Sequence, residues 1–219
     1  MHKTVQNLIN IEESIKSNLN NLKINNQTKI IAVSKTFGVD KILPLIHYGH
    51  LDFGENKVQE AVDKWTEMKE SKPNIKLHMI GRLQTNKVKF AVKLFDYIHS
   101  VDSQKLASKI SQESLKINKK IKIFIQVNIG EEKQKSGINK ENLESLISFC
   151  HELHLDLIGL MCIPPMNFDS DYYFKEMNTL KNNFGFSELS MGMSSDYLKA
   201  SENFSTFVRI GSSIFGART

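Results

Sequence analysis

The stretch KIIAVSKT, residues 29–36, decides the fold class of this chain of 219 residues. Residues 30–33 form a short, continuous apolar run, which is typical of a strand buried on both faces of a parallel sheet. Upstream, apolar residues recur every three or four positions from Val5 to Leu22, which predicts an amphipathic helix. The hydrophobic pattern therefore changes from a helical to a strand period just before this stretch.

Strand and helix patterns then alternate toward the C-terminus. Strands are expected at residues 50–53, 76–80, 96–99, 121–127, 155–160, 188–190 and 206–210, and helical faces at 58–68, 106–115, 143–150 and 172–184. Repeated strand-then-helix order implies parallel strands, and about eight such units close a barrel. The sequence predicts an α/β fold: a single (β/α)8 TIM-type barrel domain over 1–219, with an N-terminal helix within 1–24 packed on it. An open doubly wound sheet is the alternative.

The composition is that of a globular protein, with 40% apolar and 24% charged residues. No apolar stretch approaches the roughly 18 residues of a membrane span, and the N-terminus lacks the basic and apolar regions of a signal peptide. The two cysteines, Cys150 and Cys162, form no Cys-x-x-Cys pair, so neither a disulfide framework nor a metal site is expected. We expect a cytoplasmic protein without membrane contact.

The net charge of +5, from 29 basic and 24 acidic side chains, is modest. The lysines are spread from Lys3 to Lys199 rather than clustered, which favours a solvated surface over a nucleic-acid interface. The charge is also compatible with a small phosphorylated ligand.

Lys35 directly follows the first buried strand, where barrels place their functional groups. A partly desolvated amine there is suited to condensing with an aldehyde. The alternative is a lysine that merely ends a strand in solvent.

Two turns rich in Gly and Ser follow the last two strands. VRIGSSIFG, residues 208–216, offers Gly211 and Ser212 to an anion, and SMGMSSD, residues 190–196, offers Ser194. Backbone N–H groups and hydroxyls in such turns bind phosphate, and barrels often bind phosphate after these strands. The alternative for both serines is an N-cap of the following helix.

Five motifs together resemble those of the YggS/PROSC family of pyridoxal phosphate (PLP) homeostasis proteins. They are KIIAVSKT (29–36), FGENKVQEA (53–61), HMIGRLQTNK (78–87), LSMGMSSDY (189–197) and VRIGSSIFGAR (208–218). The resemblance implies a barrel like the N-terminal domain of alanine racemase, with PLP as cofactor.

Carried over by position, the resemblance makes Lys35 the catalytic residue that holds PLP as a Schiff base. It implies that Ser194, Gly211 and Ser212 bind the phosphate and that Arg209 faces the pyridine nitrogen.

The resemblance also places Asn56, His78 and Met191 at the cofactor. The alternative for Asn56 is a helix cap, and that for His78 is a histidine satisfied within the core.

A guanidinium beside the pyridine nitrogen disfavours its protonation, which PLP needs in order to act as a strong electron sink. This suits a carrier or a racemase better than a transaminase or decarboxylase. The length also leaves no room for the second, β-rich domain of alanine racemase. We therefore expect a protein that stores and delivers PLP, with PLP-dependent apoenzymes as recipients, and a monomer. A weak amino-acid racemase is the alternative, and a nucleic-acid-binding domain is the least favoured reading.

Overall fold

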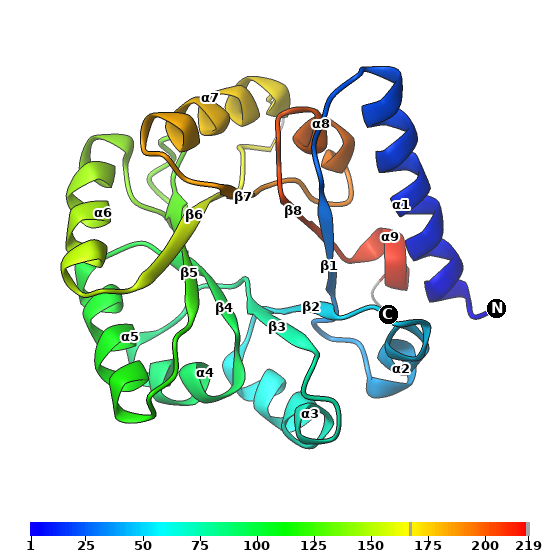
Figure 1. The fold of residues 1–219 in the computed structure, drawn as a ribbon, viewed down its shortest axis with the longest axis horizontal. Helices are drawn as coiled ribbons and strands as arrows, with labels where there is room; N and C mark the ends of the chain where they lie inside the picture. Colours follow the sequence, from blue (N-terminus) through cyan, green and yellow to red (C-terminus); the bar gives the residue numbers. More distant parts are fainter. Residues whose placement is uncertain (167, 218–219) are drawn as a thin grey trace.

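The computed structural model describes residues 1–166 and 168–217, and its centre is a closed barrel of eight parallel strands in sequence order (Figure 1). The strands are β1 (Lys29–Val33), β2 (Asp52–Glu55), β3 (Lys76–Met79), β4 (Tyr97–Val101), β5 (Lys122–Val127), β6 (Asp156–Cys162), β7 (Glu188–Ser190) and β8 (Phe207–Ile210). β8 pairs in parallel with β1, with Ile31 opposite Arg209, so the sheet has no open edge. The predicted TIM-type barrel is confirmed, and the open sheet is wrong.

The helices surround the barrel (Figure 1). They are α1 (Lys3–Asn21), α2 (Val39–Tyr48), α3 (Val58–Ser71), α4 (Val88–Leu94), α5 (Gln104–Lys116), α6 (Leu143–Glu152), α7 (Ser170–Asn183), α8 (Tyr197–Glu202) and α9 (Ser212–Phe215), with 3-10 turns at Thr85–Lys87 and Lys140–Asn142. α1 buries the apolar stripe from Val5 to Leu19 and contacts α2, α8 and α9. The predicted N-terminal helix therefore lies where the barrel closes.

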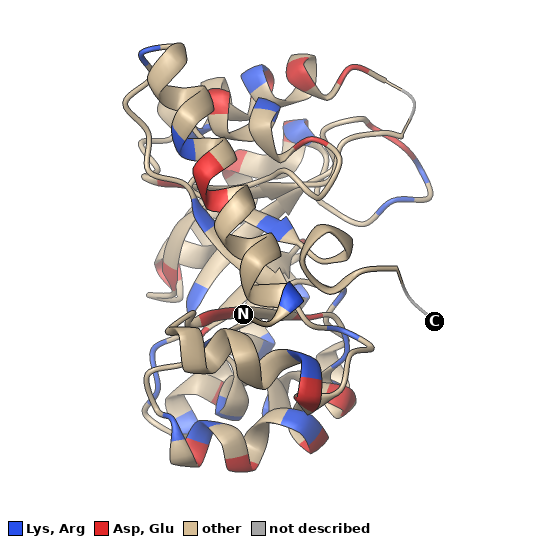
Figure 2. Ribbon diagram, turned by 90° about the vertical axis from the view of Figure 1, so that its right-hand side faces the viewer, with Lys and Arg blue, Asp and Glu red and all other residues tan. Residues whose placement is uncertain are grey.

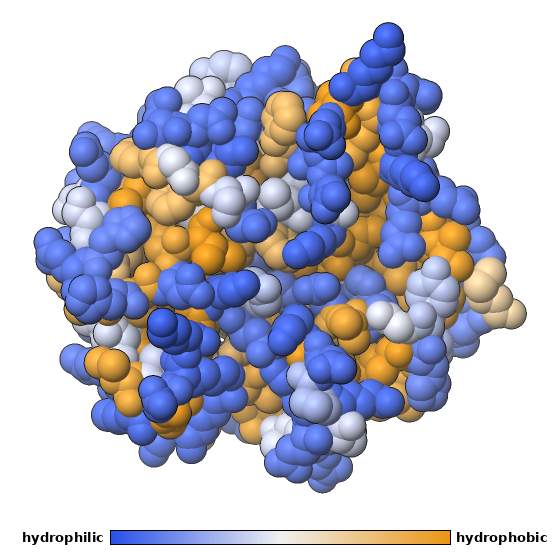
Figure 3. Space-filling model, viewed as in Figure 1, coloured by the Kyte–Doolittle hydropathy of each residue, from blue (hydrophilic) through white to orange (hydrophobic). Residues whose placement is uncertain are grey.

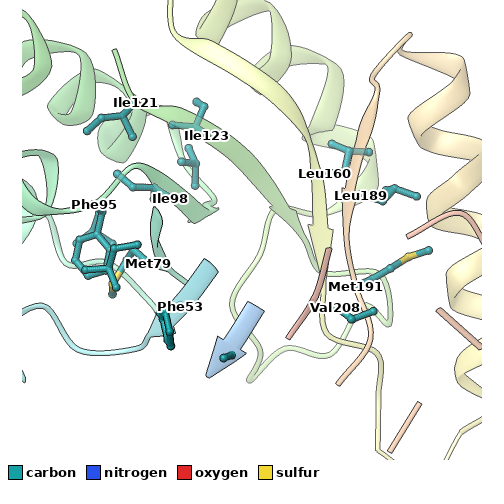
Figure 4. Packing of buried hydrophobic residues seen from close by; sticks show 14 of the residues in the cluster. Phe53, Met79, Phe95, Ile98, Ile121, Ile123, Leu160, Leu189, Met191 and Val208 are labelled. Atoms are coloured by element: carbon teal, nitrogen blue, oxygen red, sulfur yellow. The ribbon is translucent and has the colours of Figure 1, made fainter. Parts of the chain in front are cut away.

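Strand side chains alternate between the inside of the barrel and an outer layer against the helices, as the period of two requires. The outer layer lies between strands and helices and includes Phe53, Ile98, Leu160 and Met191 (Figure 4). The inner layer fills the barrel with Ile31, Phe124, Met161 and Phe207, which come from four different strands. The barrel is thus a packed core, and its usable cavity lies at a mouth.

Charges of both signs are interspersed over the side shown in Figure 2. On the face shown in Figure 3, hydrophilic residues predominate and hydrophobic residues form separate patches. Among the described residues, no helix is long and apolar enough to cross a membrane.

Candidate functional site

A cavity of about 530 Å³ lies at the carboxyl ends of the strands, within the usual size range of small-molecule pockets. Its walls come from the segments that end or follow six of the eight strands. They are Val33, Lys35, Phe37, Asn56, Ile80, Gly81, Ile163, Met193, Ser194, Ser195, Arg209, Gly211, Ser212 and Gly216. Six of the eight residues expected at the cofactor meet here, although they are scattered over most of the sequence.

Lys35 reaches the cavity because side chains alternate along β1 and its extension. Ile31 packs inside the barrel, Val33 lines the cavity, and the intervening Ser34 points outward to Glu55. Two residues beyond Val33, Lys35 again faces inward, is partly buried and lines the cavity. The alternative of a lysine that only ends a strand in solvent is therefore wrong.

A buried carboxylate anchors the chain just before Lys35. Glu55, fully buried, accepts hydrogen bonds from Ser34 Oγ at 2.8 Å and Trp65 Nε1 at 2.9 Å. Lys64 Nζ pairs with Glu55 at 3.0 Å and donates to the Ser34 carbonyl at 2.9 Å. All of these Glu55 bonds are made by Oε1, and Oε2 is buried without a hydrogen-bond partner among the described residues. Through Ser34 Oγ and the Ser34 carbonyl, the pair nevertheless holds the backbone just before Lys35.

Thr36, directly after Lys35, adopts a φ of 67°. A β-branched residue rarely takes this left-handed conformation, and such strain clusters at functional sites. Glu60 stabilises it by accepting the Thr36 N–H at 2.6 Å, and Glu60 also pairs with Lys64. The backbone on both sides of Lys35 is therefore held by one connected network of charges.

Ser194 and Ser212 line the cavity from the turns after β7 and β8. The N-cap of α8 is Asp196, and α9 starts at Ser212 with Gly211 in the cap position and no side-chain cap bond. The N-cap alternatives for both serines are therefore wrong. Ser194 Oγ lies 3.5 Å from the Ser213 nitrogen, so the two turns meet at one wall.

Arg209 is 4% exposed and lines the same cavity. Its Nη1 donates to Ser190 Oγ and its Nη2 to the Cys162 carbonyl, both at 2.8 Å. Burial lowers the pKa of the guanidinium, but an arginine keeps its charge in proteins. The site therefore contains a fixed cation held from behind.

Asn56 also lines the cavity. The N-cap of α3 is Lys57, so the cap alternative for Asn56 is wrong. Its Oδ1 is buried and accepts no hydrogen bond from the described residues. An unsatisfied buried acceptor of this kind suits a ligand or an ordered water.

His78 and Met191 lie elsewhere, unlike the expectation for both. Among the described residues, neither lines the cavity. His78 points into the barrel two residues before Ile80, which forms the cavity wall, so His78 lies farther from the barrel mouth. Met191 packs in the outer layer (Figure 4). The period of two predicts the face of a strand residue but not its depth.

Several apolar or small residues of the cavity wall were not predicted from the sequence. Ile80 with Gly81 follows β3, and Ile163 follows β6. Like Lys35, these residues lie just after strand ends, so their position could have indicated them. Their apolar or absent side chains, however, suggest no chemistry from the sequence alone. Within the described ranges, no group of His, Cys, Asp and Glu could hold a metal ion.

Similarity to known proteins identifies the family of this chain. The family described as "Alanine racemase, N-terminal domain" matches residues 11–219. Proteins named pyridoxal phosphate homeostasis protein match too. The one from Aquifex aeolicus is 37% identical over 88% of this chain and 88% of its own length, and the one from Pasteurella multocida is 35% identical over 97% of both. The chain belongs to the YggS/PROSC family.

Solved structures agree with this family assignment. PipY of Synechococcus elongatus, described with PLP bound, is 32% identical with a TM-score of 0.80, over 92% of this chain and 100% of PipY. Alanine racemase of Clostridium difficile has a TM-score of 0.70 at 16% identity, which shows a shared fold; the match covers 94% of this chain and 57% of the racemase.

Proposed function

We propose that this protein binds pyridoxal 5′-phosphate at the barrel mouth and serves in intracellular PLP homeostasis by storing and delivering the cofactor. The observation that carries the proposal is the convergence of an amine, two hydroxyl-bearing turns and a fixed cation on one cavity of about 530 Å³. The names of the relatives and the PLP bound to PipY point the same way.

The residues present fit this cofactor. Lys35 would hold its aldehyde carbon as a Schiff base, with release of one water. Ser194, Gly211 and Ser212 would bind the phosphate, since hydroxyls and turn N–H groups are its usual partners. The unsatisfied Oδ1 of Asn56 is free to accept a hydrogen bond from the ligand.

Arg209 would lie at the pyridine nitrogen. PLP, when bound, supplies an electron sink for carbanion chemistry, most strongly with that nitrogen protonated. The fixed positive charge of Arg209 disfavours this proton, which supports a carrier or a racemase over a transaminase or decarboxylase.

A weak amino-acid racemase remains the second candidate, favoured by the shared fold with alanine racemase. Racemisation needs an acid–base group on each face of the substrate. Among the described residues that line the cavity, Lys35 and Arg209 are the only titratable ones, which supports the carrier.

The experiment that tests the proposal is transfer of cofactor. The protein, loaded with PLP and freed of excess, is mixed with the apo form of a PLP-dependent enzyme, and recovered enzyme activity is followed. We expect the loaded protein to reactivate the enzyme faster than the same concentration of free PLP does. When a phosphatase that hydrolyses free PLP is present, we expect reactivation to continue from the PLP that the protein holds. No reactivation would contradict delivery.

The racemase candidate is tested by exchange of the amino-acid α-proton in deuterated water. An exchange rate in the usual enzyme range of about 1–10³ per second would overturn the carrier in favour of the racemase.

PLP-dependent apoenzymes are the proposed recipients, and the cytoplasm is the proposed compartment. Cys150 and Cys162 are both free and buried, as in proteins of reducing compartments. We propose that the carrier acts as a monomer, which sedimentation at several concentrations would test.

A further inference from the structure

A continuous chain of buried hydrogen bonds crosses the barrel interior behind the cavity. Arg209 Nη1 lies 2.8 Å from Ser190 Oγ, and Ser190 Oγ lies 2.8 Å from His99 Nδ1. His99 Nε2 lies 2.9 Å from His78 Nδ1, and His78 Nε2 lies 3.0 Å from a carboxylate oxygen of Asp52. The hydrogen-bond chain thus joins five strands, from the cation at the cavity to Asp52, the first residue of β2, at the opposite end of the barrel.

The two imidazole rings of this chain are held rigidly. His78 stacks on Tyr97 with ring centres 4.2 Å apart and planes 8° apart. His99 stacks on Phe124 at 4.3 Å and 19°. Both histidines are fully buried, as is Ser190. Since the rings cannot turn without displacing these partners, their nitrogens stay aligned with one another.

The chemistry of the two ends sets the direction of every bond between them. Arg209 only donates, so Ser190 Oγ accepts from it, and ionised Asp52 only accepts, so His78 carries its proton on Nε2. A neutral His78 then accepts at Nδ1 from the Nε2–H of His99. His99 in turn accepts at Nδ1 from the Ser190 hydroxyl.

Burial favours the neutral imidazoles that this pattern requires. It lowers the pKa of His78 and, with the charges of His78 and Arg209, sets that of His99 well below its usual value. The charged or titratable groups that face the Asp52 end of the hydrogen-bond chain are Lys29, His50, Asp96 and Tyr97. Cys162 and Asp196 face the Arg209 end. Lys29 and His50 act on Asp52, and together with the hydrogen bond from His78 they keep its pKa below the usual value although burial raises it.

We propose that Asp52, His78, His99 and Ser190 are positioning residues that hold the Arg209 guanidinium toward the ligand cavity. The ordered tautomers keep the Ser190 hydrogen on the side of His99, which leaves an oxygen lone pair for Arg209. The second anchor of the guanidinium is the Cys162 carbonyl. Its remaining N–H groups are then left for the ligand. The role of Arg209 toward PLP rests on the proposed function. The expected tautomers of His78 and His99 do not depend on PLP binding.

The first test uses the protein without ligand. Long-range ¹H–¹⁵N correlation spectra of histidine-labelled protein report the tautomer of each ring at pH 7. We expect both His78 and His99 as neutral Nε2–H forms. A predominant Nδ1–H form or a charged ring at either position would overturn the proposal.

The same spectra test whether the chain is connected. In Asp52→Ala the terminal acceptor is gone, so an Nδ1–H population should appear in His99 as well as in His78, although Asp52 does not touch His99. A change limited to His78 would contradict a connected chain. Tyr97→Phe, which preserves the ring stack, should leave both tautomers as they are.

The second test reads the effect at the cavity. With PLP bound, Ser190→Ala and His99→Phe should shift its absorption maximum or the pH midpoint of its absorbance change. They should also speed PLP release by about threefold or more, a factor that corresponds to the loss of a weak hydrogen bond. Tyr97→Phe is the matched control and should change neither.

The outcomes separate the two proposals. If the unaltered protein binds no PLP, the proposed function is wrong. The tautomer spectra alone then test whether the hydrogen-bond chain exists. If PLP binds but Ser190→Ala leaves spectrum and release unchanged, the positioning role is wrong. Because Ser190→Ala removes a single oxygen, it provides the result even if His99→Phe does not fold.

Discussion

Ser194 and Ser212 come from different strand-end turns, yet both line the same cavity. In the proposed function both donate to the charged phosphate of PLP. A hydrogen bond to a charged group contributes about 1.5–3 kcal/mol when it is well shielded, so two such bonds should dominate the retention of the cofactor.

Replacing both hydroxyls, Ser194→Ala with Ser212→Ala, should raise the PLP dissociation constant at least about tenfold, the equivalent of about 1.4 kcal/mol. Equilibrium titration followed by absorbance measures it. The control is Ser213→Ala, in the same short helix but outside the cavity lining, which should bind as the unaltered protein does. Unchanged affinity in the double variant would mean that the phosphate lies elsewhere.

At the scale of secondary-structure elements, the turn after β7 places Ser194 at the cavity. The backbone path of this turn depends on Gly192. Its φ is +91°, and an added Cβ would lie 2.4 Å from Cβ of Ala200 in α8. The turn can therefore pass closely under α8 only with glycine at this position, and this passage presents Ser194 to the cavity.

Gly192→Ala should destabilise the protein by about 2–4 kcal/mol, from left-handed backbone strain and steric overlap together. Gly49→Ala is the matched control, because Gly49 has a φ of +102° but nothing within 4 Å of the added Cβ. It should cost only about 1–2 kcal/mol of strain. Urea denaturation measures both; equal losses would show that contact with α8 does not matter.

The sequence predicts the alternation of strands and helices, but it does not predict every helix. α2 and α4 gave no helical signal, because α2 contains Pro44, a residue that normally disrupts helix interiors, and α4 spans only Val88–Leu94. A segment of two turns is too short to display a helical period. Strand ends were nevertheless predicted to within about two residues, as for β7 at Glu188–Ser190.

The site was predictable where chemistry and strand ends coincide, as at Lys35 and Ser212. The interior chain was not, because Asp52, His99 and Ser190 are separated along the sequence and only the closed barrel brings them into line. Depth along a strand and contacts across the barrel depend on register, which no local pattern encodes.

At the scale of the whole molecule, the barrel fully buries His78 and His99, and this burial favours their neutral form. Folding lowers the pKa of His78 and His99 below the ordinary value of 6.5. Below that pH the unfolded chain takes up protons that the folded barrel does not. The unfolded state then binds more protons, so the free energy of unfolding falls as the pH drops.

We therefore expect stability to be nearly constant from pH 8 to 7 and to decrease from pH 6.5 toward 5, by up to about 1.4 kcal/mol per pH unit for each histidine. Urea denaturation at a series of pH values measures this slope. His99→Phe should flatten it by about one proton. A stability that does not change between pH 7 and 5 would contradict the buried neutral pair.

The central claim is that Lys35 holds the cofactor, and reduction of the loaded protein with borohydride tests it most directly. Borohydride converts a Schiff base into a stable secondary amine, so peptide mapping by mass spectrometry locates the attached pyridoxyl group. We predict the label on Lys35, at the end of β1. A label on Lys41, Lys57 or Lys87 instead, or no label on a protein that binds PLP, would contradict this account.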